Sequence, residues 1–283
     1  MLRLSLIRLA KTAALALLLA PLASAQESPW FVTYDHHMEE PHQLELSFEP
    51  LLASPRHGNR FLASALELEF APRAWWTTEL YLDGQSTARE STLVTGYRIE
   101  NRFRLLMDEH AVNPVLYVEY AATNGADKTL REFVGFDSWR DLAASNSQSR
   151  LEKEREVETK LILSGDHRGW SIAGNLIAEK NLAGEPWEFG YAAGLSRPLA
   201  LAATPTVCLF CRENFSAGIE AYGGFGEQQQ ITLAATSHYI APSLSWALPD
   251  GLTLRVSPAF GLTSASNRFL MRFGVSYEIP MGR

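Results

Sequence analysis

Alternation between apolar and polar residues is the strongest pattern in this chain, and it is clearest near the C-terminus. Every second residue from Phe269 to Ile279 is apolar, and the positions between them include Arg272, Gly274 and Glu278. A period of two is that of a β-strand whose two faces meet different surroundings. The segment is therefore predicted to be a strand with one apolar and one polar face.

The same alternation recurs over lengths of about ten residues, which is the length that a tilted strand needs to cross a membrane. It predicts about twelve strands, at residues 42–50, 62–70, 74–83, 92–103, 114–122, 156–164, 170–179, 187–195, 214–224, 238–248, 252–262 and 269–279. Pro242 and Pro258 fall inside two of them, and because proline lacks the backbone N–H, each indicates a bulge or a lower strand count. The predicted fold is all-β, an antiparallel up-and-down transmembrane β-barrel of about 12 strands. A periplasmic β-sandwich would also alternate, but it would lack an outward apolar band.

The connections between the predicted strands alternate in length. Short turns at 71–73, 165–169 and 249–251 join strand pairs of the same parity and so lie at the same end of a barrel. Bacterial barrels keep short turns in the periplasm, so both termini are expected there and the long 123–155 connection is expected outside the cell. That connection is unusually apolar: it contains Leu130, Phe133, Val134, Phe136, Trp139 and Leu142. It is predicted to fold inward as a constriction, to lie along the rim, or to cap the barrel with a short helix or strand extension.

The first 25 residues have the three parts of a secretory signal peptide. Arg3, Arg8 and Lys11 form a basic region, residues 13–20 an apolar core, and residues 23–25 (Ala-Ser-Ala) a small-residue cleavage site. The apolar core is shorter than the roughly 20 residues that span a bilayer. The predicted organisation is therefore a signal peptide at 1–25, a periplasmic N-terminal arm at 26–42 and a transmembrane barrel at 43–283.

Charge and cysteine content narrow the function classes. The formal net charge is −7, and cleavage after residue 25 removes three cations and no acid, which gives −10. An acidic protein without a basic stripe is a poor partner for nucleic acid. The two cysteines, Cys208 and Cys211, are expected to form a local disulfide in an exported chain, because no thioredoxin-like pattern and no second cysteine pair accompany them.

The polar faces of the predicted strands collect many charged side chains, which are expected to line the lumen. This lumen-lining set comprises Glu67, Glu69, Glu79, Arg98, Glu100, Arg102, Glu119, Glu158, Lys160, Glu179, Glu188, Glu220, Arg255, Arg272 and Glu278, with Glu45 and Glu49 on the same faces. Charges removed from bulk water must be paired or hydrated. The set predicts either an ion-pair network in a narrow lumen or a water-filled channel whose carboxylates favour cations and neutral polar solutes.

The N-terminal arm has the densest cluster of metal-ligand residue types. Asp35, His36, His37 and His42 carry imidazole and carboxylate donors that suit zinc or copper. Adjacent histidines on an extended chain point to opposite sides, so they rarely bind one ion unless the chain turns between them. The alternative is a solvated arm that leads into the first strand.

The sequence gives only weak evidence for a catalytic site. Ser237, His238 and Asn214 form one possible set and Asp108 with His110 another, but neither lies in a known motif. No enzymatic activity and no cofactor are therefore predicted, although a lipid-hydrolysing barrel is not excluded.

The mature chain resembles bacterial outer-membrane β-barrel proteins over its whole length. Segments 34–41, 179–182, 186–191 and 208–214 are similar to those of an uncharacterised barrel family of Gram-negative bacteria. The resemblance implies the cell outer membrane, with its lipid and the barrel-assembly machinery as partners, and implies no activity for any residue. The chain departs from the general class by ending in Pro280-Met281-Gly282-Arg283 instead of an aromatic residue.

Two functions from different classes follow from these patterns. The first is a channel or transporter for small polar or cationic solutes through a lumen rich in glutamate. The second is a closed structural or binding barrel that acts through the 123–155 loop or through the histidine-rich and acidic arm.

Overall fold

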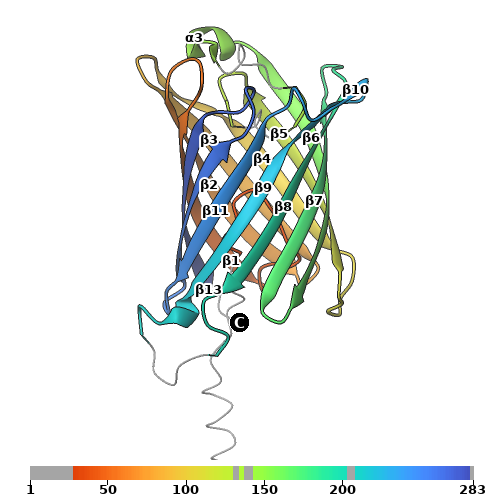
Figure 1. Cartoon of the computed structure of the whole chain (residues 1–283), viewed down its shortest axis with the longest axis vertical. Helices are drawn as coiled ribbons and strands as arrows, with labels where there is room; N and C mark the ends of the chain where they lie inside the picture. The colour runs from red at the N-terminus through yellow and green to blue at the C-terminus, as the bar shows by residue number, and fades with distance from the viewer. Residues whose placement is uncertain (1–27, 130–133, 137–142, 203–207, 281–283) are drawn as a thin grey trace, which may run out of the picture.

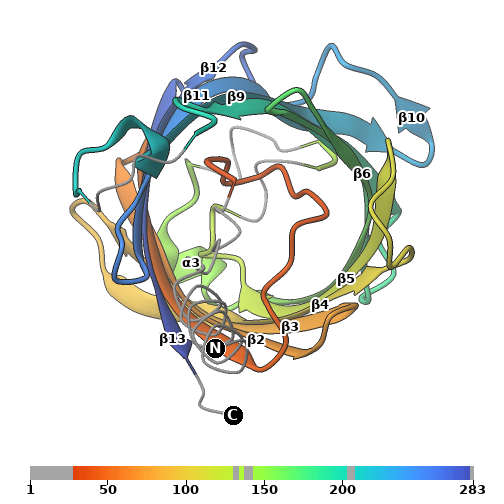
Figure 2. The ribbon, with the colours of Figure 1, turned by 90° about the horizontal axis from the view of Figure 1, so that it is seen from below.

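The strands close into one barrel. The computed structural model describes residues 28–129, 134–136, 143–202 and 208–280. The strands of the barrel wall are β1 (Gln43–Ser54), β2 (Phe61–Arg73), β3 (Trp76–Thr87), β4 (Thr92–Arg104), β5 (Asn113–Asn124), β6 (Lys153–His167), β7 (Trp170–Asn181), β8 (Trp187–Pro198), β9 (Phe215–Glu227), β11 (His238–Ala247), β12 (Leu252–Gly261) and β13 (Phe269–Pro280). Neighbours in this order pair antiparallel, and β13 pairs with β1, so the sheet has no open edge (Figures 1 and 2).

The prediction of a 12-stranded antiparallel up-and-down barrel is confirmed, with every predicted strand in place. The short strand β10 (Gln230–Ile231) pairs antiparallel with the end of β9 and was not predicted. The other regular elements within the described residues are the helix α3 (Asn146–Ser149) and the 3-10 turn η2 (Arg212–Asn214). No helix in the described part of the chain is long and apolar enough to cross a membrane.

The two ends of the barrel differ. The turn end carries the β2–β3, β4–β5, β6–β7, β8–β9 and β11–β12 connections, and the loop end carries the others, with α3 above the barrel mouth in Figure 1. The β6–β7 hairpin is tighter than predicted because β6 runs further, to His167, whereas β7 begins at Trp170 as predicted. The two residues between them, Arg168 and Gly169, both have positive φ (52° and 78°), as a two-residue hairpin turn requires.

The surface of the barrel is apolar and its interior is polar, the inverse of a water-soluble protein. Leu46, Phe48 and Leu80 are 43%, 46% and 50% exposed, whereas their neighbours Glu45 and Glu79 are only 4% and 1% exposed. A wall that turns its leucines outward and its carboxylates inward suits a hydrocarbon environment. This pattern distinguishes the barrel from a soluble β-sandwich.

The two strand prolines neither add a bulge nor remove a strand. The β11–β12 pairs on either side of them, Ile240 with Phe260 and Leu244 with Val256, keep one register, in which Pro242 faces Pro258. Pairing between these strands is interrupted only there, because neither proline has an N–H to donate. The hydroxyl of Ser257 donates to the Pro242 carbonyl across the gap, at 3.0 Å.

Two segments occupy the interior of the barrel. The N-terminal arm, residues 28–42, runs through the lumen from the turn end, as the red segment in Figure 2 shows. Its Val32 packs in a buried apolar cluster with wall residues such as Leu51, Tyr222 and Tyr239. Part of the 123–155 loop also enters, since Gly135 donates its N–H to the Phe189 carbonyl.

Only some of the apolar loop residues can be placed. Leu130, Phe133, Trp139 and Leu142 lie outside the described residues, as do the predicted signal peptide at 1–25 and the last three residues of the chain. Val134 is buried, at 3% exposed, and α3 forms a short helix at the loop end. The described part of the loop therefore combines an inward fold with a helical cap.

Candidate functional site

Strand register aligns ten glutamates across the inside of the barrel. Each is the direct cross-strand partner of the next: Glu278, Glu45, Glu69, Glu79, Glu100, Glu119, Glu158, Glu179, Glu188 and Glu227, on β13 and then β1 to β9 in order. Directly opposite residues of an antiparallel pair have Cα atoms about 4.5–5.5 Å apart. The glutamates, called here the glutamate row, therefore form one unbroken track of carboxylates.

The glutamate row climbs from one end of the barrel to the other. Glu45 and Glu278 lie at the turn end, three residues or fewer from the ends of β1 and β13. Glu119 lies in the middle of β5, while Glu188 and Glu227 lie at the loop-end limits of β8 and β9. The cause is strand tilt, because a line of hydrogen-bonded partners in a barrel spirals around the axis.

Basic side chains flank the middle of the row, two residues to either side along the strands. Arg102 pairs with Glu69 at 2.6 Å and also with Glu79 and Glu100. Arg98 pairs with Glu119 at 3.0 Å and with Asp83 at 2.9 Å. Lys160 pairs with Glu158 at 2.9 Å.

Like charges directly opposite each other destabilise a sheet. Three bases spread the charge of the central carboxylates, and Tyr117 donates a 2.9 Å hydrogen bond to Glu119. Sheet stability alone would therefore not favour placing these glutamates opposite one another.

The other members of the predicted lumen-lining set also lie inside the barrel wall. Glu67 is 7% exposed and faces Tyr81 across β2 and β3. Arg255 pairs with Glu49 at 2.6 Å, and Arg272 lies beside a cavity that Glu49 also lines. Glu220, 1% exposed, does not belong to the row and contacts the N-terminal arm instead.

Glu220 binds the backbone of the arm. Its two carboxylate oxygens accept the N–H groups of Phe31, Val32 and Thr33 at 3.1, 3.0 and 2.9 Å. Three consecutive N–H groups that converge on one carboxylate form a charge-assisted anion nest. Glu220 thus supplies the acceptor for backbone N–H groups of an arm segment that belongs to no strand.

Trp30 fills space that two glycines leave in the wall. A Cβ added to Gly194 would lie 2.5 Å from the Trp30 ring, and one added to Gly218 would lie 2.9 Å from its Nε1. Trp30 is 2% exposed. The indole of the arm therefore occupies the room that these glycines leave inside the wall.

Tyr34 joins the arm to the centre of the glutamate row. Asn175 accepts the Tyr34 N–H and donates to its carbonyl, both at 2.8 Å, as a strand partner would. The Tyr34 hydroxyl donates to Glu100 at 3.2 Å, and the Lys160 ammonium lies 4.6 Å from the ring centroid. The arm is therefore fixed by specific polar contacts as well as by apolar packing.

The described residues line two well-formed cavities inside the barrel. One, of about 120 Å³, lies towards the turn end and is lined by Glu45, Glu69 and Glu79. The other, of about 130 Å³, is lined by Asp83, Arg98 and Glu158, among others. Phe31 and Tyr34 line both cavities, so the arm lies between them.

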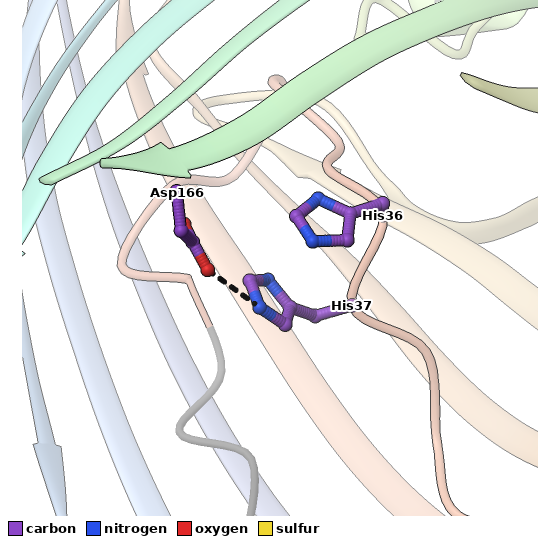
Figure 3. Close-up of side chains that lie close together, drawn as sticks. All are labelled: His36, His37 and Asp166. Atoms are coloured by element: carbon purple, nitrogen blue, oxygen red, sulfur yellow. Dashed lines mark ion pairs between the residues drawn. The ribbon is translucent and has the colours of Figure 1, made fainter. Parts of the chain in front are cut away.

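The histidines of the arm meet the β6–β7 turn. His36 and His37 have ring centroids 4.2 Å apart, because the chain bends at His36 and brings both rings to one side. The His37 Nε2 lies 3.2 Å from Asp166, as Figure 3 shows, and the His36 Nε2 lies 2.9 Å from Glu109. Asp166 and Glu109 were missed by sequence reasoning because they are more than 70 residues away in the chain.

The predicted metal-ligand set is only partly assembled. Asp35 bonds to His37 on the side away from Asp166, and this hydrogen bond raises the pKa of His37 to about 9. Burial lowers the pKa of His36, which favours its neutral form. His42 is exposed, has a positive φ of 67°, and is not among the clustered donors of the described residues.

The remaining candidates fall elsewhere. Cys208 and Cys211 are disulfide-bonded in the β8–β9 connection. Asn214 bonds to the Cys208 carbonyl at the turn end, nine residues along β9 from Gly223, the partner of His238. The grouping of Ser237, His238 and Asn214 is therefore not formed.

The second catalytic grouping also fails geometrically. The His110 Nδ1 contacts the backbone carbonyl of Asp108 and not its carboxylate. A carbonyl can orient an imidazole but cannot supply the negative charge that a carboxylate gives in a hydrolytic triad.

Comparisons with known proteins agree with the architecture. No family model and no curated protein matches this chain. A solved outer membrane channel from Pseudomonas putida F1 is similar over 88% of this chain and 100% of its own, with a TM-score of 0.57 and 9% identity. The NanC porin is similar over 83% of this chain and 100% of its own (TM-score 0.51, 10% identity), and the KdgM porin in complex with disordered oligogalacturonate over 83% and 99% (TM-score 0.51, 8% identity). This chain has the fold of the outer-membrane β-barrel porins and channels.

Proposed function

We propose that this protein is an outer-membrane channel for small cations and small cationic or polar solutes, and that the glutamate row is its conduction path. The observation that carries the proposal is the unbroken register of ten carboxylates from the turn end to the loop end. Neighbouring solved structures with the same fold are named as a channel and as porins.

The spacing of the row suits stepwise movement of cations. A permeating ion needs sites that bind well enough to replace part of its hydration shell and that lie close enough together for the ion to leave. Adjacent carboxylates about 5 Å apart meet both needs. Arg98, Arg102 and Lys160 beside the row weaken individual sites, so that no single carboxylate cluster holds a cation too tightly.

The N-terminal arm sets the width of this path. Cavities of about 120 and 130 Å³ on either side of Phe31 and Tyr34 hold a few water molecules each. Low conductance is therefore expected while the arm is docked and higher conductance when it leaves. We place the turn end and both termini in the periplasm, as short bacterial hairpins generally are.

Planar-bilayer recording tests the channel. The full chain is expected to give small, cation-selective single-channel currents, and a variant that lacks residues 28–41 is expected to give larger ones. Heat-modifiable migration on a gel confirms that both proteins are folded barrels. Folded protein that conducts in neither form, or that selects anions, contradicts the proposal.

The docked arm also favours a second function, a closed structural or binding barrel. Glu220 and Asn175 fix the arm at 2.8–3.1 Å, and a plug fixed so firmly suits a barrel that stays shut. In that case deletion of the arm, or of the described loop residues 143–152, abolishes a cellular phenotype while conductance stays absent. Purified protein that hydrolyses phospholipid or lipopolysaccharide would instead favour an enzyme.

A further inference from the structure

We propose that His36, His37, Asp166 and Glu109 form a binding site for one divalent transition-metal ion of the zinc type, which fastens the N-terminal arm to the turn end of the barrel wall. Donor atoms of His36, His37 and Asp166 all lie within 4.8 Å of one another. Glu109 lies outside that group of three, but one of its oxygens is 2.9 Å from the His36 Nε2, and we take it as the fourth donor.

Polar contacts at the Nδ1 atoms hold the two imidazoles in orientation. The Ser164 hydroxyl lies 2.7 Å from the His36 Nδ1, and an Asp35 oxygen lies 3.2 Å from the His37 Nδ1. The same Asp35 oxygen accepts the backbone N–H of His37 at 2.8 Å. Metal-binding histidines almost always have their second ring nitrogen held in this way by a carboxylate, carbonyl, hydroxyl or water. The His36 Nε2 faces Glu109 and the His37 Nε2 faces Asp166, and the ion replaces the proton that His37 carries there.

An independent feature of His36 points to a ligand. The residue is 1% exposed, and within the described residues its Nε2 makes no hydrogen bond of acceptable geometry despite its short distance to Glu109. A buried polar atom without such a bond costs about 1–3 kcal/mol. A metal ion bound at Nε2 satisfies the atom and also neutralises the carboxylates that gather around it.

The donor set selects the class of ion. Two imidazoles and two carboxylates suit four-coordinate zinc, whereas magnesium and calcium prefer sites made of oxygen donors alone. Donors of a tetrahedral zinc site lie roughly 3.3 Å apart, given zinc–ligand distances of 2.0–2.2 Å. The cluster must contract slightly, and Asp166 and Glu109 can move because they are 43% and 57% exposed. Their exposure also gives the ion a way in.

Such an ion would bridge two parts of the molecule. His36 and His37 belong to the arm, Asp166 belongs to the end of β6, and Glu109 belongs to the β4–β5 connection. Binding energy that exists only while the arm is docked stabilises the docked arm.

Metal titration of the full chain tests the site. Untagged protein in detergent is freed of metal with a chelator, titrated with Zn²⁺ by calorimetry, and assayed for bound zinc after dialysis. One zinc per chain is expected, with no displacement by excess Mg²⁺. Asp166→Asn and His37→Gln are each expected to weaken zinc binding at least tenfold, and His57→Gln, an exposed histidine at the loop end, is the matched control.

Two results would overturn the proposal. One is the absence of stoichiometric zinc in the folded wild-type protein, and the other is equal zinc affinity in the wild type and in Asp166→Asn. Asp166 lies at the end of β6 and is 43% exposed, so this variant is expected to fold, which heat-modifiable migration checks. The titration needs no current through the barrel, so its failure leaves the channel proposal untouched.

Discussion

At the scale of single residues, the N-terminal arm is fixed by a few contacts that join distant parts of the chain. Glu220 binds three backbone N–H groups of the arm, Trp30 rests against Gly194, and Asn175 pairs with Tyr34. Each of these wall residues fits a strand pattern whether or not an arm is present. Their role therefore becomes visible only in three dimensions.

Removing the charge of Glu220 should loosen the arm. Hydrogen bonds to a charged group contribute about 1.5–3 kcal/mol, and each 1.4 kcal/mol changes an equilibrium about tenfold. In a Thr33→Cys background, Glu220→Gln is expected to speed maleimide labelling of the buried thiol about tenfold or more. Glu185→Gln, an exposed loop change, is the control. Equal labelling rates in all three proteins would show that Glu220 does not hold the arm.

A single methyl group at Gly194 should have a similar effect through sterics. The added Cβ would lie 2.5 Å from Trp30, whereas one added to Gly174 on the neighbouring strand meets no atom within 4 Å. Gly194→Ala is expected to displace the indole and expose Thr33→Cys to maleimide, and Gly174→Ala is expected to leave labelling unchanged. If Gly194→Ala leaves the labelling rate unchanged, Trp30 does not pack against Gly194.

At the scale of elements, the strands alone were largely predictable, and their alignment was not. Alternation marks each strand because one face meets an apolar environment and the other a polar one. Register depends on turn geometry and barrel closure, which no single segment encodes. Sequence reasoning therefore found the inward glutamates one by one but missed that they are direct neighbours, and it missed Glu227 altogether.

The interrupted β11–β12 ladder gives a prediction at this scale. Pro242 and Pro258 face each other in register, and neither can donate a hydrogen bond. The double variant Pro242→Thr/Pro258→Thr is expected to restore ladder bonds worth about 1 kcal/mol each and to raise the temperature of the heat-modifiable gel shift. A lower transition temperature would show that the gap is required for barrel closure.

At the scale of the whole molecule, fold class followed from the sequence, but the filled interior did not. Residues 28–42 are short and polar enough to suit a solvated arm, and nothing local in them signals that residues 140 to 190 positions later will bind them. The full cluster around His36 and His37 could not be predicted from the sequence for the same reason. The donors of the arm were recognised, whereas Asp166, at the end of β6, and Glu109, in the β4–β5 connection, are brought near only when the barrel closes.

The central claim is that the glutamate row carries cations across the barrel. The most direct test is the reversal potential of the arm-deleted barrel in a salt gradient, compared between Glu179→Gln/Glu188→Gln and the loop control Glu185→Gln. We predict a cation-selective potential for the parent and the control, and a clear shift towards zero in the double variant. A parent without cation selectivity, or a double variant that keeps the parent's potential, would contradict the claim.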